Sequence, residues 1–434
     1  MTPENTAVAP VPAAPAAPAA DALQAKLLAA RDAARGLATL TTAQKNAGLE
    51  AIAAALEGAA SAVRDENARD LAAGRENGLT EGILDRLLLT EERLGDLAAA
   101  VREIIALPDP VGTVLRGNAL PNGLLLSQVR VPFGVVGAIY EARPNVTVDI
   151  AALALKSGNG VVLRGGTAAQ HSNAALVALI RGALESAGIS GECVQTIDEF
   201  GRDGANRLMR ARGFVDVLIP RGSAELIRTV VEHATVPVIE TGAGMVHIFL
   251  DATAEPQMAL DIVRNAKTQR VGVCNAVETL LVHEDAAEAL LPMLASMLLA
   301  EGVALRGCER ARQLVPEMAA ADEAEWTNEH LALELGVRVV PSLDAAVAHI
   351  DAYSTRHTEA IITRDYANAE RFVAAVDSAT VIVNASTRFT DGGEFGFGAE
   401  VGISTQKLHA RGPMGLPELT STKWIVRGSG QVRP

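Results

Sequence analysis

Short apolar runs alternate with longer amphipathic stretches from residue 134 onward. Helical periodicity separates the runs, as at 147–157, 169–187 and 224–233. Short continuous apolar strands between helices of about 10–19 residues are typical of βαβ units, in which helices cover both faces of a parallel sheet. The predicted strands of this series are 134–140, 160–163, 193–197, 215–219 and 236–239.

A second series with the same rhythm follows a break near 241–245. We therefore predict an α/β fold with two doubly wound parallel-sheet domains. The first domain is expected to comprise 21–110, which is mostly helical, together with 131–241, and the second to comprise 242–388. The predicted strands of the second series are 247–250, 276–283, 303–306, 337–340, 360–363 and 380–384.

Three segments fall outside this rhythm. Two runs around an Asn-Gly turn predict a β-hairpin over 111–130, and 423–427 also has the composition of a strand. Because an isolated hairpin is marginal in water and its edges invite pairing, 111–130 and 411–434 are predicted to form a small β oligomerisation element. The Gly-rich segment 389–410 is expected to return to the first domain, and 1–20 is predicted to be a disordered Ala/Pro tail.

Composition excludes several classes of protein. The formal net charge is −14, from 38 basic and 52 acidic residues, which argues against a nucleic-acid-binding protein. The three cysteines are widely spaced and show neither a disulfide framework nor the spacing of metal ligands, so we expect no metal site. No basic residue precedes Lys26, and no apolar run is long enough to span a membrane. The pattern favours a cytoplasmic protein with no membrane or nucleic-acid partner.

Cys274 is the first candidate for chemistry. It lies in a predicted turn between a helix and a strand, beside Gly272 and Asn275. The nearby Lys267 and Arg270 are expected to favour the thiolate, which is the nucleophilic form of cysteine. The alternative is a buried structural cysteine, and Cys193 and Cys308 fit that alternative better.

Two further candidates follow predicted strands, at the sheet edge where open α/β sheets bind ligands. Glu240 directly follows the strand 236–239, where a carboxylate could accept a proton or orient water. Asn145 falls near the start of a helix, so it could either cap that helix or stabilise an oxyanion.

Arginine and glycine stand together after two other strands, in Leu163-Arg-Gly-Gly and in Ile219-Pro-Arg-Gly-Ser. Such loops can cradle phosphate, although neither standard nucleotide-binding fingerprint occurs in the chain. The candidates in these loops are Arg164, Gly222 and Ser223.

The order Asn145, Arg164, Gly222-Ser223, Glu240, Cys274 resembles the aldehyde dehydrogenase superfamily, including the interval of 34 residues from Glu240 to Cys274. Within it, the likeness is strongest to the family of γ-glutamyl phosphate reductases. The segments that carry this likeness are Val131-Pro-Phe-Gly-Val-Val-Gly, Tyr140-Glu-Ala-Arg-Pro-Asn-Val-Thr, Arg270-Val-Gly-Val-Cys-Asn-Ala, His357-Thr-Glu-Ala-Ile and Gly396-Phe-Gly-Ala-Glu-Val-Gly.

This resemblance implies a role for each candidate. Cys274 would be the nucleophile and Asn145 would bind the oxyanion, while Glu240 could be either catalytic or positioning. Arg164, Gly222, Ser223 and, on a looser alignment, Glu329 would bind the cofactor, and Arg143 and Glu141 the substrate. The first domain would then bind the cofactor and the second would carry the nucleophile.

The resemblance also implies an activity and its partners. The expected reaction is the NADPH-dependent reduction of L-glutamyl 5-phosphate to L-glutamate 5-semialdehyde, through a thioester on Cys274, in proline biosynthesis. A homo-oligomer, most simply a dimer, and a transient contact with glutamate 5-kinase are expected. Two alternatives stay open, namely a hydrolytic NAD(P)-dependent aldehyde dehydrogenase and a non-catalytic α/β binding protein.

Overall fold

A four-stranded parallel sheet organises the first domain of the computed structural model, which describes residues 21–433. Its strand order is β5-β4-β3-β6, and all six residues of β3 are buried. This explains why the strand is a continuous apolar run rather than an alternating one. The strands are β3 (Val135–Tyr140), β4 (Gly160–Arg164), β5 (Val194–Thr196) and β6 (Val217–Arg221).

Helices cover both faces of this sheet. One face packs against α1 (Ala22–Leu37), α8 (Gly201–Met209) and α9 (Ala224–His233). The other packs against a larger group of helices, within which α6 is buried along almost its whole length. That group comprises α2 (Thr42–Gly58), α5 (Glu91–Ala106), α6 (Pro144–Lys156) and α7 (Gln170–Ser186), with α3 (Ala60–Glu76) and α4 (Glu81–Leu87) beside it.

The second domain contains a seven-stranded parallel sheet in the order β10-β9-β11-β8-β7-β12-β13. Its strands are β7 (Val246–Leu250), β8 (Val277–His283), β9 (Ala304–Gly307), β10 (Ala319–Ala320), β11 (Glu334–Val340), β12 (Thr358–Ile362) and β13 (Thr380–Val383). One face packs against α10 (Pro256–Thr268), α11 (Glu284–Ala300) and α12 (Glu309–Leu314), and the other against α13 (Leu343–Tyr353) and α14 (Tyr366–Ala375). The predicted fold class, two doubly wound parallel sheets, is confirmed.

One predicted strand is wrong. The run 236–239 is apolar enough for a strand, but it forms only an isolated bridge, between Val238 and Leu218 of β6. It lies at the open edge of the first sheet, where the chain turns toward the second domain, and so has no second neighbour with which to extend a ladder.

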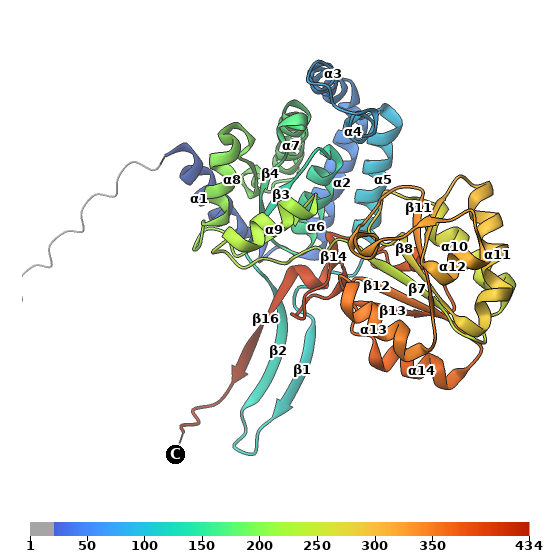
Figure 1. The fold of residues 1–434 in the computed structure, drawn as a ribbon. Helices are drawn as coiled ribbons and strands as arrows, with labels where there is room; N and C mark the ends of the chain where they lie inside the picture. The colour runs from blue at the N-terminus through green and yellow to red at the C-terminus, as the bar shows by residue number, and fades with distance from the viewer. Residues whose placement is uncertain (1–20, 434) are drawn as a thin grey trace, which may run out of the picture.

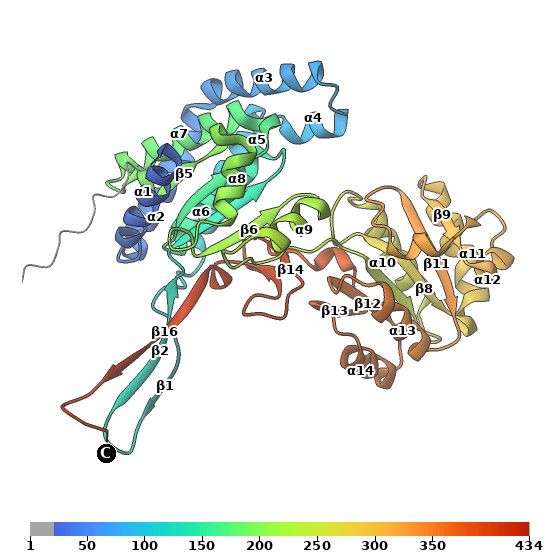
Figure 2. The ribbon, with the colours of Figure 1, turned by 60° about the vertical axis from the view of Figure 1, so that its left-hand side comes forward.

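Three antiparallel strands form an arm outside both domains. The predicted hairpin is present as β1 (Val114–Ala119) and β2 (Leu125–Pro132), and β16 (Thr420–Arg427) pairs along the whole of β2. In both views the arm projects away from the two domains (Figures 1 and 2).

Residues 401–419 belong to the first domain rather than to the arm. The short strands β14 (Gly402–Ser404) and β15 (Gly412–Met414) pair with each other, and Val401, Met414 and Leu419 join the core of the first domain. The arm strand therefore begins at Thr420, later than the predicted boundary at 411, because the apolar side chains before it are buried elsewhere.

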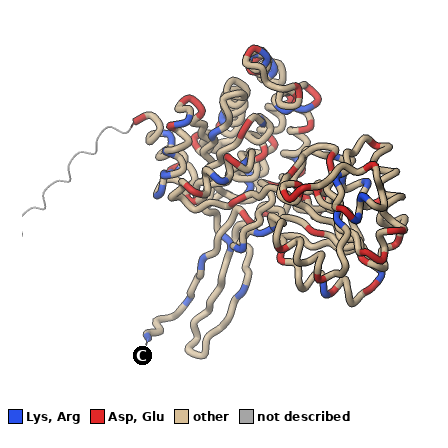
Figure 3. The backbone as a smooth tube through the Cα atoms, viewed as in Figure 1, with Lys and Arg blue, Asp and Glu red and all other residues tan. Residues whose placement is uncertain are grey.

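The distribution of charged residues and the hydropathy of the helices agree with the expectations drawn from the composition. Acidic and basic residues are interspersed over both domains (Figure 3). Within 21–433, no helix is both long enough and apolar enough to cross a bilayer. The Ala/Pro segment 1–20, predicted to be a tail, lies outside the described residues.

Candidate active site

Residues from both domains line one cavity of about 860 Å³. It brings together six of the residues predicted from the sequence: Arg143, Asn145, Gly222, Ser223, Cys274 and Glu329. Cys274 and Glu329 come from loops of the second domain, and the other four from loops or helix starts that follow strands of the first. The cavity therefore lies between the carboxyl edge of the first sheet, the edge that open α/β sheets use for ligands, and the loops that lead into β8 and β11 of the second sheet.

Cys274 is fixed by backbone packing on one side and by hydrogen bonds on the other. Its loop joins α10 to β8, and the Cα of Gly244 lies so close that a Cβ built there would be 1.5 Å from the Cys274 carbonyl oxygen. The neighbouring Asn275 donates from Nδ2 to the carbonyl of Thr390 (2.9 Å), and its own carbonyl accepts from Thr387 Oγ1 (2.8 Å). The backbone that carries the thiol is therefore held at the cavity wall.

The charge that faces this thiol differs from the prediction. Burial raises the pKa of Cys274 to about 11, and the guanidinium of Arg221 acts in the opposite direction. Lys267 does not take part: its ammonium is buried and donates to Glu278 Oε2 and to the Val277 carbonyl, both at 2.9 Å. Arg270, the other predicted cation, does line the cavity.

Asn145 stands at the second position of α6, whose first residue, Pro144, presets the helical backbone. The helix N-cap is Arg143, so Asn145 does not cap the helix. Its Nδ2 instead donates to Asp149 Oδ2, one turn along the helix (3.2 Å). Asn145 thus presents an amide donor at the cavity wall, as an oxyanion-binding residue requires.

Arginines and acidic residues both line the same cavity. The arginines are Arg86, Arg93, Arg143, Arg221, Arg270 and Arg388, and the acidic residues are Asp85, Asp96, Glu329, Asp391 and Glu400. Arg93 pairs with Asp85 (2.7 Å), whereas the other five arginines have no ion-pair partner within 4 Å among the described residues. Burial lowers the pKa of Arg143, and the neighbouring charges of Arg221, Arg86 and Arg270 lower it further. Clustered cations that repel one another and are not engaged in ion pairs favour the binding of an anion.

Glu141 and the Gly222-Ser223 turn form a single unit. The Glu141 carboxylate accepts from the backbone N–H and from the hydroxyl of Ser223, both at 2.8 Å, and Ser223 caps α9. A Cβ at Gly222 would lie 2.7 Å from that carboxylate. Glu141, predicted to bind substrate, is thus engaged in holding the turn and is not among the residues that line the cavity.

Glu329 and Glu240 have different surroundings. Glu329 lines the cavity, where its Oε1 accepts from the Gly244 N–H (2.7 Å) and burial raises its pKa. Glu240 is not among the lining residues, and its Oε2 accepts from Gln406 Nε2 (3.4 Å).

Arg164 also lies outside the cavity lining. It ends β4, and its guanidinium donates to the carbonyls of Gly165 (2.6 Å) and Gly201 (3.4 Å). The guanidinium is thus held at the carboxyl edge of the first sheet, one strand away from the end of β3 that leads to α6.

Two functional candidates, Arg221 and Asp149, were not predicted from the sequence. Arg221 lies in Ile219-Pro-Arg-Gly-Ser, where an arginine between a predicted strand and a glycine could have indicated it. Asp149 gave only the signal of an acid four residues after Asn145, within an otherwise apolar helix.

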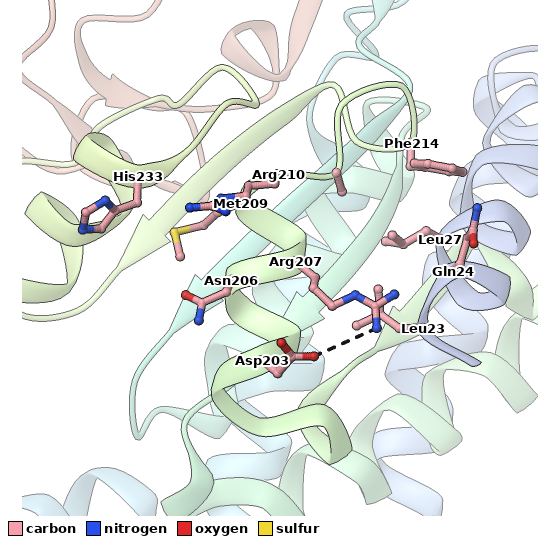
Figure 4. A pocket seen from close by; sticks show the side chains of 11 residues that line it. Leu23, Gln24, Leu27, Asp203, Asn206, Arg207, Met209, Arg210, Phe214 and His233 are labelled. Atoms are coloured by element: carbon pink, nitrogen blue, oxygen red, sulfur yellow. Dashed lines mark ion pairs between the residues drawn. The ribbon is translucent and has the colours of Figure 1, made fainter. Parts of the chain in front are cut away.

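A second cavity, of about 630 Å³, lies between α1 and the end of α8. Apolar side chains, including Leu27 and Phe214, and the Arg207–Asp203 pair line it (Figure 4). None of the predicted site residues lines this cavity.

Comparison with known proteins identifies the family of the chain. The model of the "Aldehyde dehydrogenase family" matches residues 3–302. The γ-glutamyl phosphate reductase of Clavibacter michiganensis is 63% identical over 431 residues, which cover 99% of this chain and 100% of the relative. The chain belongs to the γ-glutamyl phosphate reductase family, within the aldehyde dehydrogenases.

Solved structures agree with membership of the γ-glutamyl phosphate reductase family. The crystal structure of γ-glutamyl phosphate reductase from Thermotoga maritima superposes with a TM-score of 0.94 at 46% identity, covering 95% of this chain and 100% of that one. An acetylating aldehyde dehydrogenase from Geobacillus thermoglucosidasius shares the fold, with a TM-score of 0.69 at 16% identity over 95% of this chain and 97% of that one.

The reactivity of Cys274 should follow its raised pKa. Because the thiol stays largely protonated below a pKa of about 11, its alkylation rate with iodoacetamide should rise about tenfold per pH unit between pH 7 and 9. Peptide mapping by mass spectrometry measures this rate. The buried Cys193, whose pKa is raised to about 12, is the internal control and should remain unmodified. A rate that reaches its plateau below pH 8 would contradict this assignment.

Proposed function

We propose that this protein reduces L-glutamyl 5-phosphate to L-glutamate 5-semialdehyde and phosphate with NADPH, the second step of proline biosynthesis from glutamate. The observation that carries the proposal is Cys274, the candidate nucleophile, in a cavity with five guanidiniums that have no ion-pair partner among the described residues. An acyl phosphate offers both an electrophilic carbon for the thiolate and an anionic leaving group for the arginines. The names of the relatives supply the glutamyl part of the substrate.

The chain's own groups account for the first half of the reaction. The Cys274 thiolate attacks the acyl carbon, and the resulting oxyanion accepts a hydrogen bond from Asn145 Nδ2. The C–O bond to phosphate then breaks, phosphate leaves toward the arginines, and a thioester on Cys274 remains. NADPH, when bound, supplies the hydride that converts this thioester into the aldehyde and frees the thiol.

The surroundings of Glu240 favour reduction over hydrolysis. A hydrolytic aldehyde dehydrogenase needs a base beside the thioester to activate water. Glu240, the candidate for that role, is hydrogen-bonded to Gln406 and is not among the residues that line the cavity. We therefore assign it a structural role at the connection between the domains, where its backbone N–H also bonds to Gln406 (3.0 Å).

The residues at the carboxyl edge of the first sheet fit a dinucleotide phosphate. Arg164 offers a fixed cation at the end of β4, and the Gly222-Ser223 turn opens α9, whose N-terminus favours anions. Within the proposal, Arg164 binds the adenosine 2′-phosphate, the turn contacts the central phosphates, and Glu329 binds the nicotinamide ribose. NADPH rather than NADH is therefore the proposed reductant.

The arm supplies the surface for a homodimer. Its exposed apolar side chains include Val114, Leu125, Trp424 and Val426, of which Trp424 is 49% exposed. An outer strand with unpaired backbone groups and apolar side chains favours pairing with a second copy.

We further propose a transient contact with glutamate 5-kinase, because an acyl phosphate that diffuses through water would be hydrolysed. We also propose a cytoplasmic location, because all three cysteines are free thiols.

The reverse reaction tests the proposed activity. With L-glutamate 5-semialdehyde and NADP⁺, NADPH should form only when inorganic phosphate is present. Cys274→Ser should abolish turnover while NADPH binding is retained, because a serine hydroxyl is not ionised at neutral pH. The Cys193→Ala and Cys308→Ala variants are the controls and should keep their activity. Phosphate-independent formation of glutamate would instead identify a hydrolytic dehydrogenase, and NADPH binding without any turnover would identify a binding protein.

Arg164→Ala should weaken the binding of NADPH by about 1.5–3 kcal/mol, because a charged hydrogen bond to the 2′-phosphate is lost. NADH lacks that phosphate, so its affinity should change little. Fluorescence titration with both cofactors measures the difference. Equal weakening of the two would show that Arg164 does not bind the 2′-phosphate.

Deletion of residues 424–434 should remove the dimer. The outer half of β16 would be lost, which leaves 125–128 of β2 unpaired on that side and yields monomers or aggregates. Light scattering at micromolar protein concentration measures the mass before and after deletion. An intact chain that scatters as a monomer of 45.1 kDa would refute the proposed assembly.

A further inference from the structure

The partner of Asn145 has no role in the chemistry described so far. Asp149 lies one helical turn after Asn145 on α6, and its Oδ2 accepts from Asn145 Nδ2 at 3.2 Å. Asn145 lines the cavity, whereas Asp149 is not among the lining residues. Asp149 is therefore placed to act on the reaction through Asn145 rather than by touching the substrate.

The chemistry of an amide explains why such a partner matters. An asparagine side chain has a donor end, Nδ2, and an acceptor end, Oδ1, of nearly the same shape. Only the donor end stabilises an oxyanion, since the acceptor end would repel it. A carboxylate only accepts hydrogen bonds, so it pairs with Nδ2 and disfavours the flipped amide, in which two oxygens would face each other.

We propose that Asp149 is a positioning residue that holds the Asn145 amide with its donor end toward the reacting carbon. Nδ2 carries two hydrogens, one of which is engaged by Asp149, so the other remains for the oxyanion. The proposal rests on the proposed function, in which Asn145 stabilises the oxyanion.

The surroundings of Asp149 are consistent with a carboxylate at neutral pH. Burial raises its pKa to about 6, while the hydrogen bond from Asn145 and the charge of Arg221 act against this rise. Arg221 lines the cavity and also lowers the pKa of Cys274. A residue that acted only as a counterion to Arg221 would affect the thiol instead of the amide, and the experiment must separate these two roles.

The test uses acylation of Cys274 by p-nitrophenyl acetate, in which the thiolate attacks the ester carbon, a thioester forms and p-nitrophenolate leaves. The reaction passes through the same type of oxyanion but needs neither NADPH nor a phosphate. Asn145→Ala should slow the burst of p-nitrophenolate by about 10²–10³-fold, as loss of one oxyanion donor does. Asp149→Leu should slow it by a factor of at least about 10, with a normal iodoacetamide rate at Cys274. Asp149→Asn, whose amide can pair with either end of the Asn145 amide, should give a rate between those of Asp149→Leu and the unsubstituted protein.

A double-mutant cycle gives the decisive result. If Asp149 acts through Asn145, Asp149→Leu should have no further effect in the Asn145→Ala background. Additive losses, or a slower iodoacetamide reaction in Asp149→Leu, would overturn the proposal and assign Asp149 to Arg221 or to general stability. The proposal would also be overturned if the wild-type protein showed no Cys274-dependent burst of p-nitrophenolate. The matched control is Asp261→Leu on α10. Asp261 accepts a hydrogen bond from the exposed amide of Gln257, four residues earlier (3.0 Å), and its replacement should leave the burst rate unchanged.

The phosphate-dependent reaction provides a second measurement. In that reaction Asp149→Leu should lower kcat and leave the KM for phosphate within about threefold, because the oxyanion exists only along the reaction path. The two proposals can fail separately. If the double-mutant cycle with p-nitrophenyl acetate gives the expected result but the protein does not turn over glutamate 5-semialdehyde, the proposed function is overturned and the role of Asp149 stands. A rise in KM with an unchanged kcat would contradict the role of Asp149 instead.

Discussion

The contact between Gly244 and the backbone of Cys274 is the constraint on which the site depends. No side chain fits between the two, since a Cβ would lie 1.5 Å from the carbonyl oxygen. The same short connector is held by Glu329 at the Gly244 N–H and by Thr355 at the Met245 N–H. The link between the two sheets and the Cys274 loop are therefore packed as one unit, so a shift of the connector would displace the backbone that carries the thiol.

Electrostatic strain is the second organising feature. The arginines around the cavity repel one another, and burial destabilises both a thiolate at Cys274 and the charged form of Arg143. The costs at the arginines fall when an anion occupies the cavity, whereas the thiolate, which is itself an anion, is not stabilised by one. The raised pKa keeps the Cys274 thiol largely protonated at neutral pH, which limits unwanted oxidation of the thiol.

Much of the fold could be predicted from the sequence, because strands buried on both faces leave continuous apolar runs and their order along the chain repeats. Cys274 and Asn145 could be placed for the same reason, since each follows or precedes such a run directly. Pairings between side chains of different elements could not be predicted. Lys267 looked available to the thiol, yet Glu278 neutralises it from the following strand. Glu240 looked free at a strand end, yet it meets Gln406, which is 166 residues away. The run 236–239 has the composition of a strand but lacks a second neighbour.

The arm joins segments that are far apart in the chain. Gln128 on β2 bonds to Thr422 on β16 across 294 residues, and buried Asn159 donates to the Leu419 carbonyl at the base of the arm across 260 residues. Contacts of such separation form late, because the entropy of closing so large a loop must be overcome first. During synthesis, the ribosome must complete both sheets before β16 can dock. The arm, which is the proposed partner-binding surface, is therefore the last part of the molecule to mature. A half-made chain that still lacks the Cys274 loop presents no finished arm to a neighbour.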